Sequence, residues 1–92
     1  MNDTILLHPA DNVAVALKDL AASQQLTLPS GQPLTLIDDI AFGHKVAVRA
    51  IRQGEKVLKY GLPIGSALRD IAAGEHVHVQ NLKSDYVWRE DR

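Results

Sequence analysis

Apolar residues and glycine recur along this chain at one fixed spacing, I-x-x-G-x-x-V. The pattern occurs in residues Asp39 to Val48, Ala50 to Lys59 and Asp70 to Val79. The glycine predicts a turn at which positive φ is tolerated, and the alternating residues after it predict a short strand. The valines that follow the glycines are expected to share one buried face: Val46, Val48, Val57, Val77 and Val79. We therefore expect a mainly β fold built from turn-plus-strand units.

Two stretches depart from this alternation and predict helices. Residues Asp11 to Ala22 carry apolar residues at helical spacing behind Asp11 as an N-cap, which predicts a helix of about three turns. Residues Ile64 to Gly74 predict a shorter helix of about two turns, capped by Ser66. Between the two stretches, the turn-forming residues Ser30 to Gln32 predict a β-hairpin.

Length and composition favour one small domain. The chain has 92 residues, 46% of them apolar but only 4% aromatic, so its core is expected to consist of aliphatic side chains. We expect residues 1–81 to form this domain and residues 82–92 to form a polar C-terminal tail. Within the tail, Tyr86, Val87 and Trp88 make an apolar spot.

Charge and residue usage exclude several classes of function. A formal net charge of −1, without a basic run, argues against a nucleic-acid partner. The absence of cysteine excludes thiolate chemistry and leaves the imidazoles as the softest metal ligands. The apolar run Ile5 to Leu7 is too short for a signal peptide or a membrane span. We therefore expect a cytoplasmic protein without a membrane contact, and a homo-oligomer is compatible with the sequence.

The clearest candidate for chemistry is the histidine pair in GEHVHVQN, residues 74–81. On a strand, His76 and His78 point to the same side, about 6.5 to 7 Å apart, and can converge on one metal ion such as zinc or iron. The other copies of the repeat have Lys45 and Ala47, or Lys56 and Leu58, at these places, so the histidines are additions to the scaffold. The alternative is a pair of solvated imidazoles on an open sheet face.

Three further motifs hold polar residues that are candidates for chemistry. In HPADN, His8, Asp11 and Asn12 could face a ligand, or Asp11 could act only as a helix cap. In GHK, His44 and Lys45 are interpreted as a solvated turn. The third motif, KYGLPIGS at residues 59–66, could aim backbone N–H groups at a carboxylate or be a plain connection. In the first case its residues Lys59 and Tyr60 would contribute charge and a proton.

Together, HPADNVAVALKDL, GHKVAV, KYGLPIG and GEHVHVQN resemble the N-terminal SAF-type domain of the altronate and galactarate dehydratase family. The resemblance extends over residues 5–81 and implies a β-clip fold. In single-chain dehydratases this domain is joined to a much larger catalytic part, which this chain lacks. The chain is therefore more similar to the separate small subunit of two-subunit members, such as sulfolactate sulfo-lyase, or to an excised domain.

The resemblance also implies an activity. Members of the family eliminate water, or sulfite, from a sugar acid or related 2-hydroxy acid, and the sugar-acid dehydratases depend on a divalent metal, Fe²⁺ ahead of Mn²⁺. A large catalytic subunit is the implied partner, and it would complete the metal site and supply most substrate contacts. The isolated chain is then expected to be inactive. The alternative is a non-catalytic SAF-type module that binds a sugar acid or a protein.

On this reading, specific residues take specific roles. We expect His76 and His78 to be catalytic residues and metal ligands. Lys59 and Tyr60 are expected to be catalytic residues as well. The residues expected to bind substrate are His8, Asp11, Asn12 and Gly61.

Overall fold

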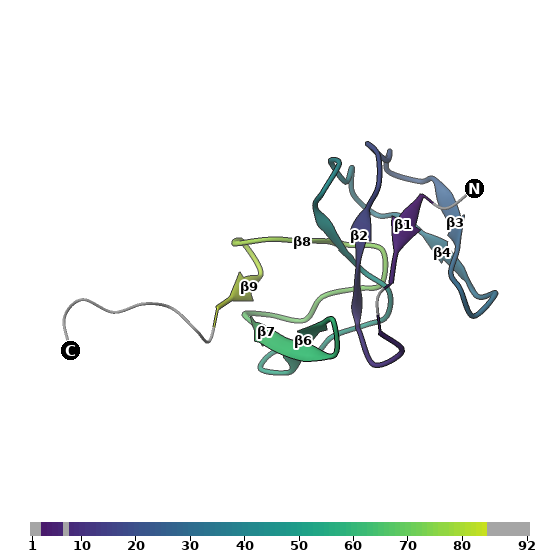
Figure 1. Cartoon of the computed structure of the whole chain (residues 1–92). Coiled ribbons are helices and arrows are strands. Elements are labelled where there is room, and N and C mark those ends of the chain that lie inside the picture. Colours follow the sequence, from purple (N-terminus) through teal and green to yellow (C-terminus); the bar gives the residue numbers. More distant parts are fainter. Residues whose placement is uncertain (1–2, 7, 85–92) are drawn as a thin grey trace, which may run out of the picture.

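The computed structural model describes residues 3–6 and 8–84, and this part of the chain contains strands and no helix. The strands, labelled in Figure 1, are β1 (Thr4–Ile5), β2 (Val13–Ala16), β3 (Gln25–Thr27), β4 (Pro33–Thr35), β5 (Lys45–Ala47), β6 (Lys56–Lys59), β7 (Leu62–Ala67), β8 (His76–Val77) and β9 (Leu82–Lys83). The prediction of a mainly β fold is confirmed, and both predicted helices are wrong.

All strand pairs are antiparallel and form three small sheets. The central sheet has the order β1-β2-β5-β8, so β8 lies at one of its edges. Figure 1 shows the hairpin of β3 and β4 on one side of β2, and the sheet of β6, β7 and β9 on the other. The predicted hairpin turn is confirmed, and Gly31 within it has φ of 90°.

The central sheet separates two apolar cores, because adjacent residues of a strand point to opposite faces. On β5, Val46 packs into the first core, with residues of β2, β3 and β4, whereas Ala47 packs into the second, with residues of β6 and β7. The expectation that the repeat valines share one face is therefore wrong. Val46 belongs to the first core, Val57 and Val77 belong to the second, and Val79 is 75% exposed.

The first predicted helix, Asp11 to Ala22, is replaced by β2, an internal strand of the central sheet. An internal strand covered on both faces has apolar residues at consecutive positions, so Val13, Ala14 and Ala16 are all buried and mimic helical spacing. The β-branched Val13 and Val15 favour the strand.

The second predicted helix, Ile64 to Gly74, is divided between β7 and the next turn. Within β7, Gly65 is buried against the backbone of Lys83 on β9, an approach that only a residue without a side chain allows. Because β9 includes Leu82 and Lys83, the folded domain continues past residue 81. The apolar spot of the predicted tail, Tyr86 to Trp88, lies outside the described residues.

The predicted repeat is present, with a fourth copy that the sequence pattern did not reveal. Gly43, Gly54 and Gly74 have φ of 83°, 83° and 88°, and the isoleucine three residues before each forms an isolated bridge. In the fourth copy, Leu20 bridges Ile40 and Ser23 takes the glycine position with φ of 73°. The sequence pattern does not show this copy, because leucine and serine take the places of isoleucine and glycine.

We expect Ser23→Gly to stabilise the domain by about 0.5 to 1 kcal/mol. A left-handed backbone costs an L-residue about 1 to 2 kcal/mol, which exceeds the entropy of about 0.5 to 1 kcal/mol that glycine loses on folding. Urea unfolding would measure the difference, with Ala22→Gly in the same turn as the control. Ala22 has no positive φ, so its replacement should destabilise, and equal effects of the two changes would contradict the strain at Ser23.

Candidate metal centre

Three of the four histidines converge at one end of the central sheet. His44, His76 and His78 each offer a ring nitrogen, and these nitrogens lie within 4.8 Å of one another. His44 Nδ1 lies 2.9 Å from His76 Nε2, at hydrogen-bond distance. The rings stack with centroids 5.1 Å apart for both pairs that include His44 and 5.6 Å apart for His76 and His78. His76 and His78 lie side by side as predicted, but only His76 lies in β8, and His78 follows the strand in a bend.

The pairing of β5 with β8 brings His44 to the other two histidines. Val46 lies opposite His76 and Lys45 opposite Val77, so the same register continued by one residue sets His44 opposite His78. Side chains directly opposite each other on an antiparallel pair have Cβ atoms about 4.5 to 5.5 Å apart. The long-range register therefore creates the cluster, and it is not visible in the local sequence.

His44 also departs from the other copies of the repeat in its turn. The equivalent residues Gln24, Glu55 and Glu75 each accept a hydrogen bond through the side chain from the backbone N–H three residues earlier, at 3.2, 2.9 and 2.9 Å. The ring of His44 instead faces His76. The interpretation of GHK as a plain solvated turn missed this residue, and the signal was a histidine at a position where the other copies carry glutamine or glutamate.

The surroundings of His76 favour a neutral imidazole. Partial burial lowers the pKa of His76 below its ordinary value, and the neighbouring His44 and His78 lower it further. The carboxylate of Asp38 acts in the opposite direction and raises this pKa, but its effect is smaller. The same carboxylate accepts a hydrogen bond from the backbone N–H of His76 at 2.9 Å. A neutral imidazole has a free lone pair for a metal ion at neutral pH.

His44 and His76 border an open depression of about 520 Å³. Its other walls come from the paired turns around Leu20 and Ile40, with Asp19 and Asp39 among the lining residues. Asp39 accepts a hydrogen bond from the N–H of Ala22, and Asp19 accepts one from Phe42, so both carboxylates hold the turns. An ion at the three histidines would thus be open to solvent or to a partner.

Asp11 and Asn12, predicted to bind substrate, are buried and hold the backbone of β6 and of the turn after it. The carboxylate of Asp11 accepts hydrogen bonds from the N–H groups of Tyr60 and Gly61 at 2.9 and 2.7 Å. Tyr60 has φ of 58°, and the two hydrogen bonds hold this strained turn in place. The carboxamide of Asn12 bonds to Lys56 and Leu58 of β6.

The remaining predicted residues gather at the same turn. His8 is exposed, and its ring lies so close to Gly61 that a Cβ added there would be 2.7 Å from Cδ2. Lys59 Nζ lies 5.1 Å from the centre of the Tyr60 ring. The structure thus brings His8, Asp11, Lys59, Tyr60 and Gly61 together in a second group. Burial lowers the pKa of Lys45, and the charge of Lys59 lowers it further, so the Lys45 ammonium lies within electrostatic range of the second group.

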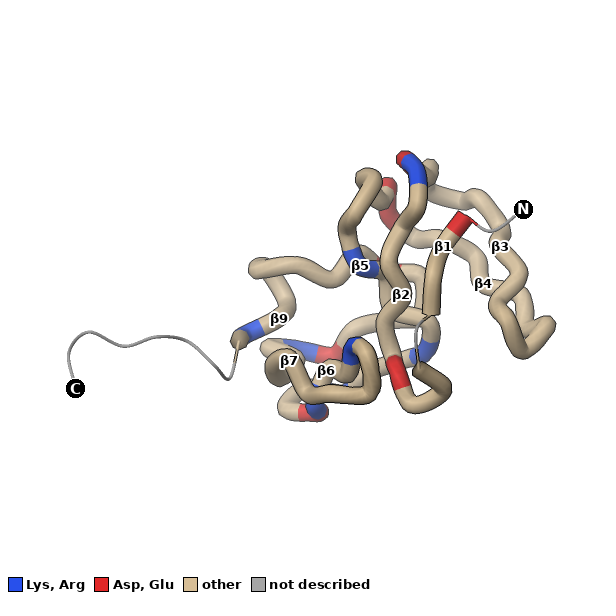
Figure 2. The backbone as a smooth tube through the Cα atoms, viewed as in Figure 1, with Lys and Arg blue, Asp and Glu red and all other residues tan. Residues whose placement is uncertain are grey.

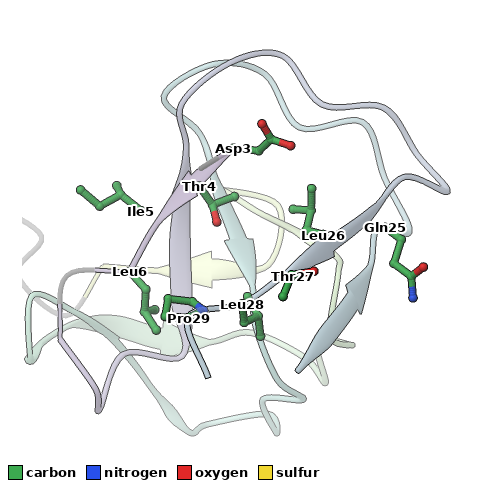
Figure 3. Close-up of a pocket in the computed structure, with 9 residues that line it drawn as sticks. All are labelled: Asp3, Thr4, Ile5, Leu6, Gln25, Leu26, Thr27, Leu28 and Pro29. Atoms are coloured by element: carbon green, nitrogen blue, oxygen red, sulfur yellow. The ribbon is translucent and has the colours of Figure 1, made fainter. Parts of the chain in front are cut away.

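A larger hollow of about 650 Å³ lies elsewhere, between β1 and β3 (Figure 3). Its lining includes leucines, threonines and one carboxylate, Asp3, which forms an ion pair with Lys18 at 3.1 Å. None of the lining residues is a histidine, so this hollow does not offer the chemistry of the three-histidine cluster.

The charge distribution of the described residues shows no region of a single sign. Figure 2 shows acidic and basic positions interspersed along the backbone. In the described part of the chain, no helix is long and apolar enough to cross a membrane.

Comparison with known proteins identifies the family. The sequence model of the altronate/galactarate dehydratase SAF domain matches residues 2–85. The chain is 52% identical over 81 residues to altronate dehydratase of Escherichia coli and 41% identical over 85 residues to that of Bacillus subtilis. These matches cover 88% and 92% of the chain but only 16% and 17% of the two relatives, so the chain spans about a sixth of their length.

A third relative is similar over its whole length. The chain is 37% identical over 91 residues to the alpha subunit of (2R)-sulfolactate sulfo-lyase of Chromohalobacter salexigens, covering 91% of the chain and 97% of that subunit. The order of motifs, the β architecture and these matches agree, and the chain belongs to the SAF-domain family of altronate and galactarate dehydratases.

Proposed function

We propose that this chain is the small subunit, or the N-terminal domain, of a hydro-lyase that eliminates water or sulfite from a sugar acid or related 2-hydroxy acid. The observation that carries the proposal is the convergence of His44, His76 and His78 in a chain of this family. The match to the whole sulfo-lyase alpha subunit supports a separate small subunit. The β-clip fold implied by the resemblance remains a prediction within the observed β architecture.

The residues present fit a divalent metal ion. The three ring nitrogens lie within 4.8 Å of one another, and ligand nitrogens around a tetrahedral ion, at about 2.0 to 2.1 Å from it, would lie about 3.3 Å apart. Three neutral imidazole ligands would leave the positive charge of the ion uncompensated. Imidazole favours Fe²⁺ over Mn²⁺, in agreement with the metal expected from the family. When bound, such an ion would supply a Lewis acid that stabilises negative charge on a substrate oxygen.

The chain's own residues would then bind the ion and orient the substrate. His44, His76 and His78 would hold the ion, and the carboxylate of Asp38 fixes the backbone of His76 through its hydrogen bond from the His76 N–H. Lys59 and Tyr60 are proposed to reach the substrate from the second group, with an ammonium for its carboxylate and a phenol for proton transfer. His8 and Gly61 would contact the substrate beside them.

Asp11 and Asn12 take a different proposed role from the one expected, because their polar atoms are buried and hydrogen-bonded to backbone. We propose that they shape β6 and the turn that presents Lys59 and Tyr60, and do not touch the substrate.

We expect the chain alone to show no turnover, because a large catalytic subunit would supply the base that removes the proton next to the carboxylate. The test assays the purified chain, the large subunit and their mixture against hexarates, hexonates and sulfolactate with added Fe²⁺ or Mn²⁺. Turnover in the mixture alone would support the proposal. Turnover by the large subunit that the chain does not increase would contradict it.

The second candidate function is a non-catalytic module that binds a sugar acid or a protein. It is favoured by the depression beside His44 and His76, which is open to solvent. Binding of a sugar acid by the chain without any effect on turnover of the mixture would support this candidate.

A further inference from the structure

Asn81 is a fully buried polar residue directly after the histidine segment. Its side-chain nitrogen donates a hydrogen bond to the carbonyl of His76 at 2.8 Å, and its side-chain oxygen accepts one from the N–H of His78 at 2.9 Å. One carboxamide therefore bridges the backbone on both sides of Val77, between the two histidines.

Asn12 forms the same bridge on the equivalent segment of another repeat. Its nitrogen donates to the carbonyl of Lys56 at 2.9 Å, and its oxygen accepts from the N–H of Leu58 at 2.8 Å. Asn12 and Asn81 are both 0% exposed. Lys56 and Leu58 occupy the repeat positions of His76 and His78. An asparagine carboxamide therefore bridges the same backbone positions in both copies, and of these two copies only the one bridged by Asn81 has histidines there.

The bridge matters because β8 is weakly held by its sheet. The strand has only two residues, lies at the edge of the central sheet and pairs with β5 on one side alone. His78 already lies outside the strand, in a bend. On the open side of β8, the Asn81 carboxamide supplies the hydrogen bonds that a neighbouring strand would otherwise give.

We propose that Asn81 is a positioning residue of the metal centre, whose carboxamide fixes the backbone from His76 to His78 so that both imidazoles face His44. The inference rests on the proposed function, because it assumes that the three histidines bind a metal ion. Asn81 does not contact the ion itself. It acts through the relative orientation of the two imidazoles that do.

The test compares Asn81→Asp with Asn12→Asp in the full chain. Aspartate keeps the shape and the acceptor of asparagine but loses the donor, and at position 81 it also sets a carboxylate near Glu75, whose Oε2 lies 3.4 Å from the Asn81 nitrogen. Co²⁺ titration, followed by visible absorption, reports both the dissociation constant and the coordination geometry. We expect Asn81→Asp to weaken Co²⁺ binding about 10- to 100-fold and to alter the spectrum. Asn12→Asp should lower the melting temperature while leaving Co²⁺ affinity within about twofold of wild type.

The possible results distinguish the positioning role of Asn81 from the existence of the metal centre. If the wild-type chain does not bind Co²⁺, the metal centre itself is wrong, and the role of Asn81 is wrong with it. If wild type binds and Asn81→Asp binds equally well with the same spectrum, only the positioning role is overturned. Equal weakening by Asn12→Asp would also overturn it, since the effect would then be general. Should Asn81→Asp fail to fold, Asn81→Ser, whose hydroxyl can satisfy only one of the two backbone groups, replaces it with the same expected weakening.

Discussion

Replacing His44 with alanine is expected to weaken metal binding by the chain about 100-fold or more and to remove the turnover of the reconstituted complex. Loss of one of three ligands leaves two imidazoles, too few to compete with water for a divalent ion at micromolar concentration. Metal content after dialysis against Fe²⁺ or Zn²⁺, together with turnover in the presence of the large subunit, measures both effects. His76→Ala and His78→Ala should behave in the same way.

The chain contains its own control for this experiment. His8 is the one histidine outside the cluster, and it is exposed. His8→Ala should therefore retain full metal content, whatever it does to substrate binding. If His44→Ala also retains the metal while His76→Ala and His78→Ala lose it, the site is the two-histidine pair that the sequence predicted, and the cluster of three is incidental. Unchanged metal content in all three variants would show that the histidines do not form a metal site.

His44 shows where inference from this sequence reaches its limit. The pair His76 and His78 was predictable, because residues two apart in an extended segment point to the same side, although β8 ends at Val77 and His78 follows it in a bend. His44 reaches them only through the pairing of β5 with β8, and no local pattern specifies which strands pair or in which register. The four family motifs quoted from the sequence contain all three histidines, but their order along the chain does not say which lie together.

The wrong helices have a related cause. Helical spacing and the continuous burial of an internal strand give the same apolar pattern over a few residues, and β2 is such a strand. The glycine turns were predicted correctly because positive φ is a property of a single residue. The turn at Ser23 was not predicted, because serine is not a residue that typically indicates positive φ. Local conformation could therefore be inferred where a single residue determines it. The packing of strands could not be inferred, because it depends on residues far apart in the sequence.

Gly74→Ala is expected to destabilise the domain by about 3 to 4 kcal/mol, a large part of the 5 to 15 kcal/mol that holds a typical domain folded. Gly74 has φ of 88°, which costs alanine about 1 to 2 kcal/mol, and a Cβ there would also collide with the backbone carbonyl oxygen of Thr35. Backbone hydrogen bonds to Ala47 and from Ile37, at 2.8 and 2.9 Å, prevent this residue from moving away.

The matched control for this change is Gly54→Ala, in the copy of the repeat at Ala50 to Lys59. Gly54 has φ of 83°, but nothing lies within 4 Å of the position where its Cβ would be. Its replacement should therefore cost only the backbone strain of about 1 to 2 kcal/mol. Urea unfolding of both variants separates strain from collision, since the difference between their losses of stability is the energy of the contact with Thr35.

Because Gly74 precedes His76 by two residues, any Gly74→Ala protein that folds should also bind metal more weakly, whereas Gly54→Ala should not. Equal losses of stability in the two variants would mean that the end of β4 at Thr35 yields to the added methyl group, and that the backbone next to the histidines is less firmly fixed than its hydrogen bonds indicate.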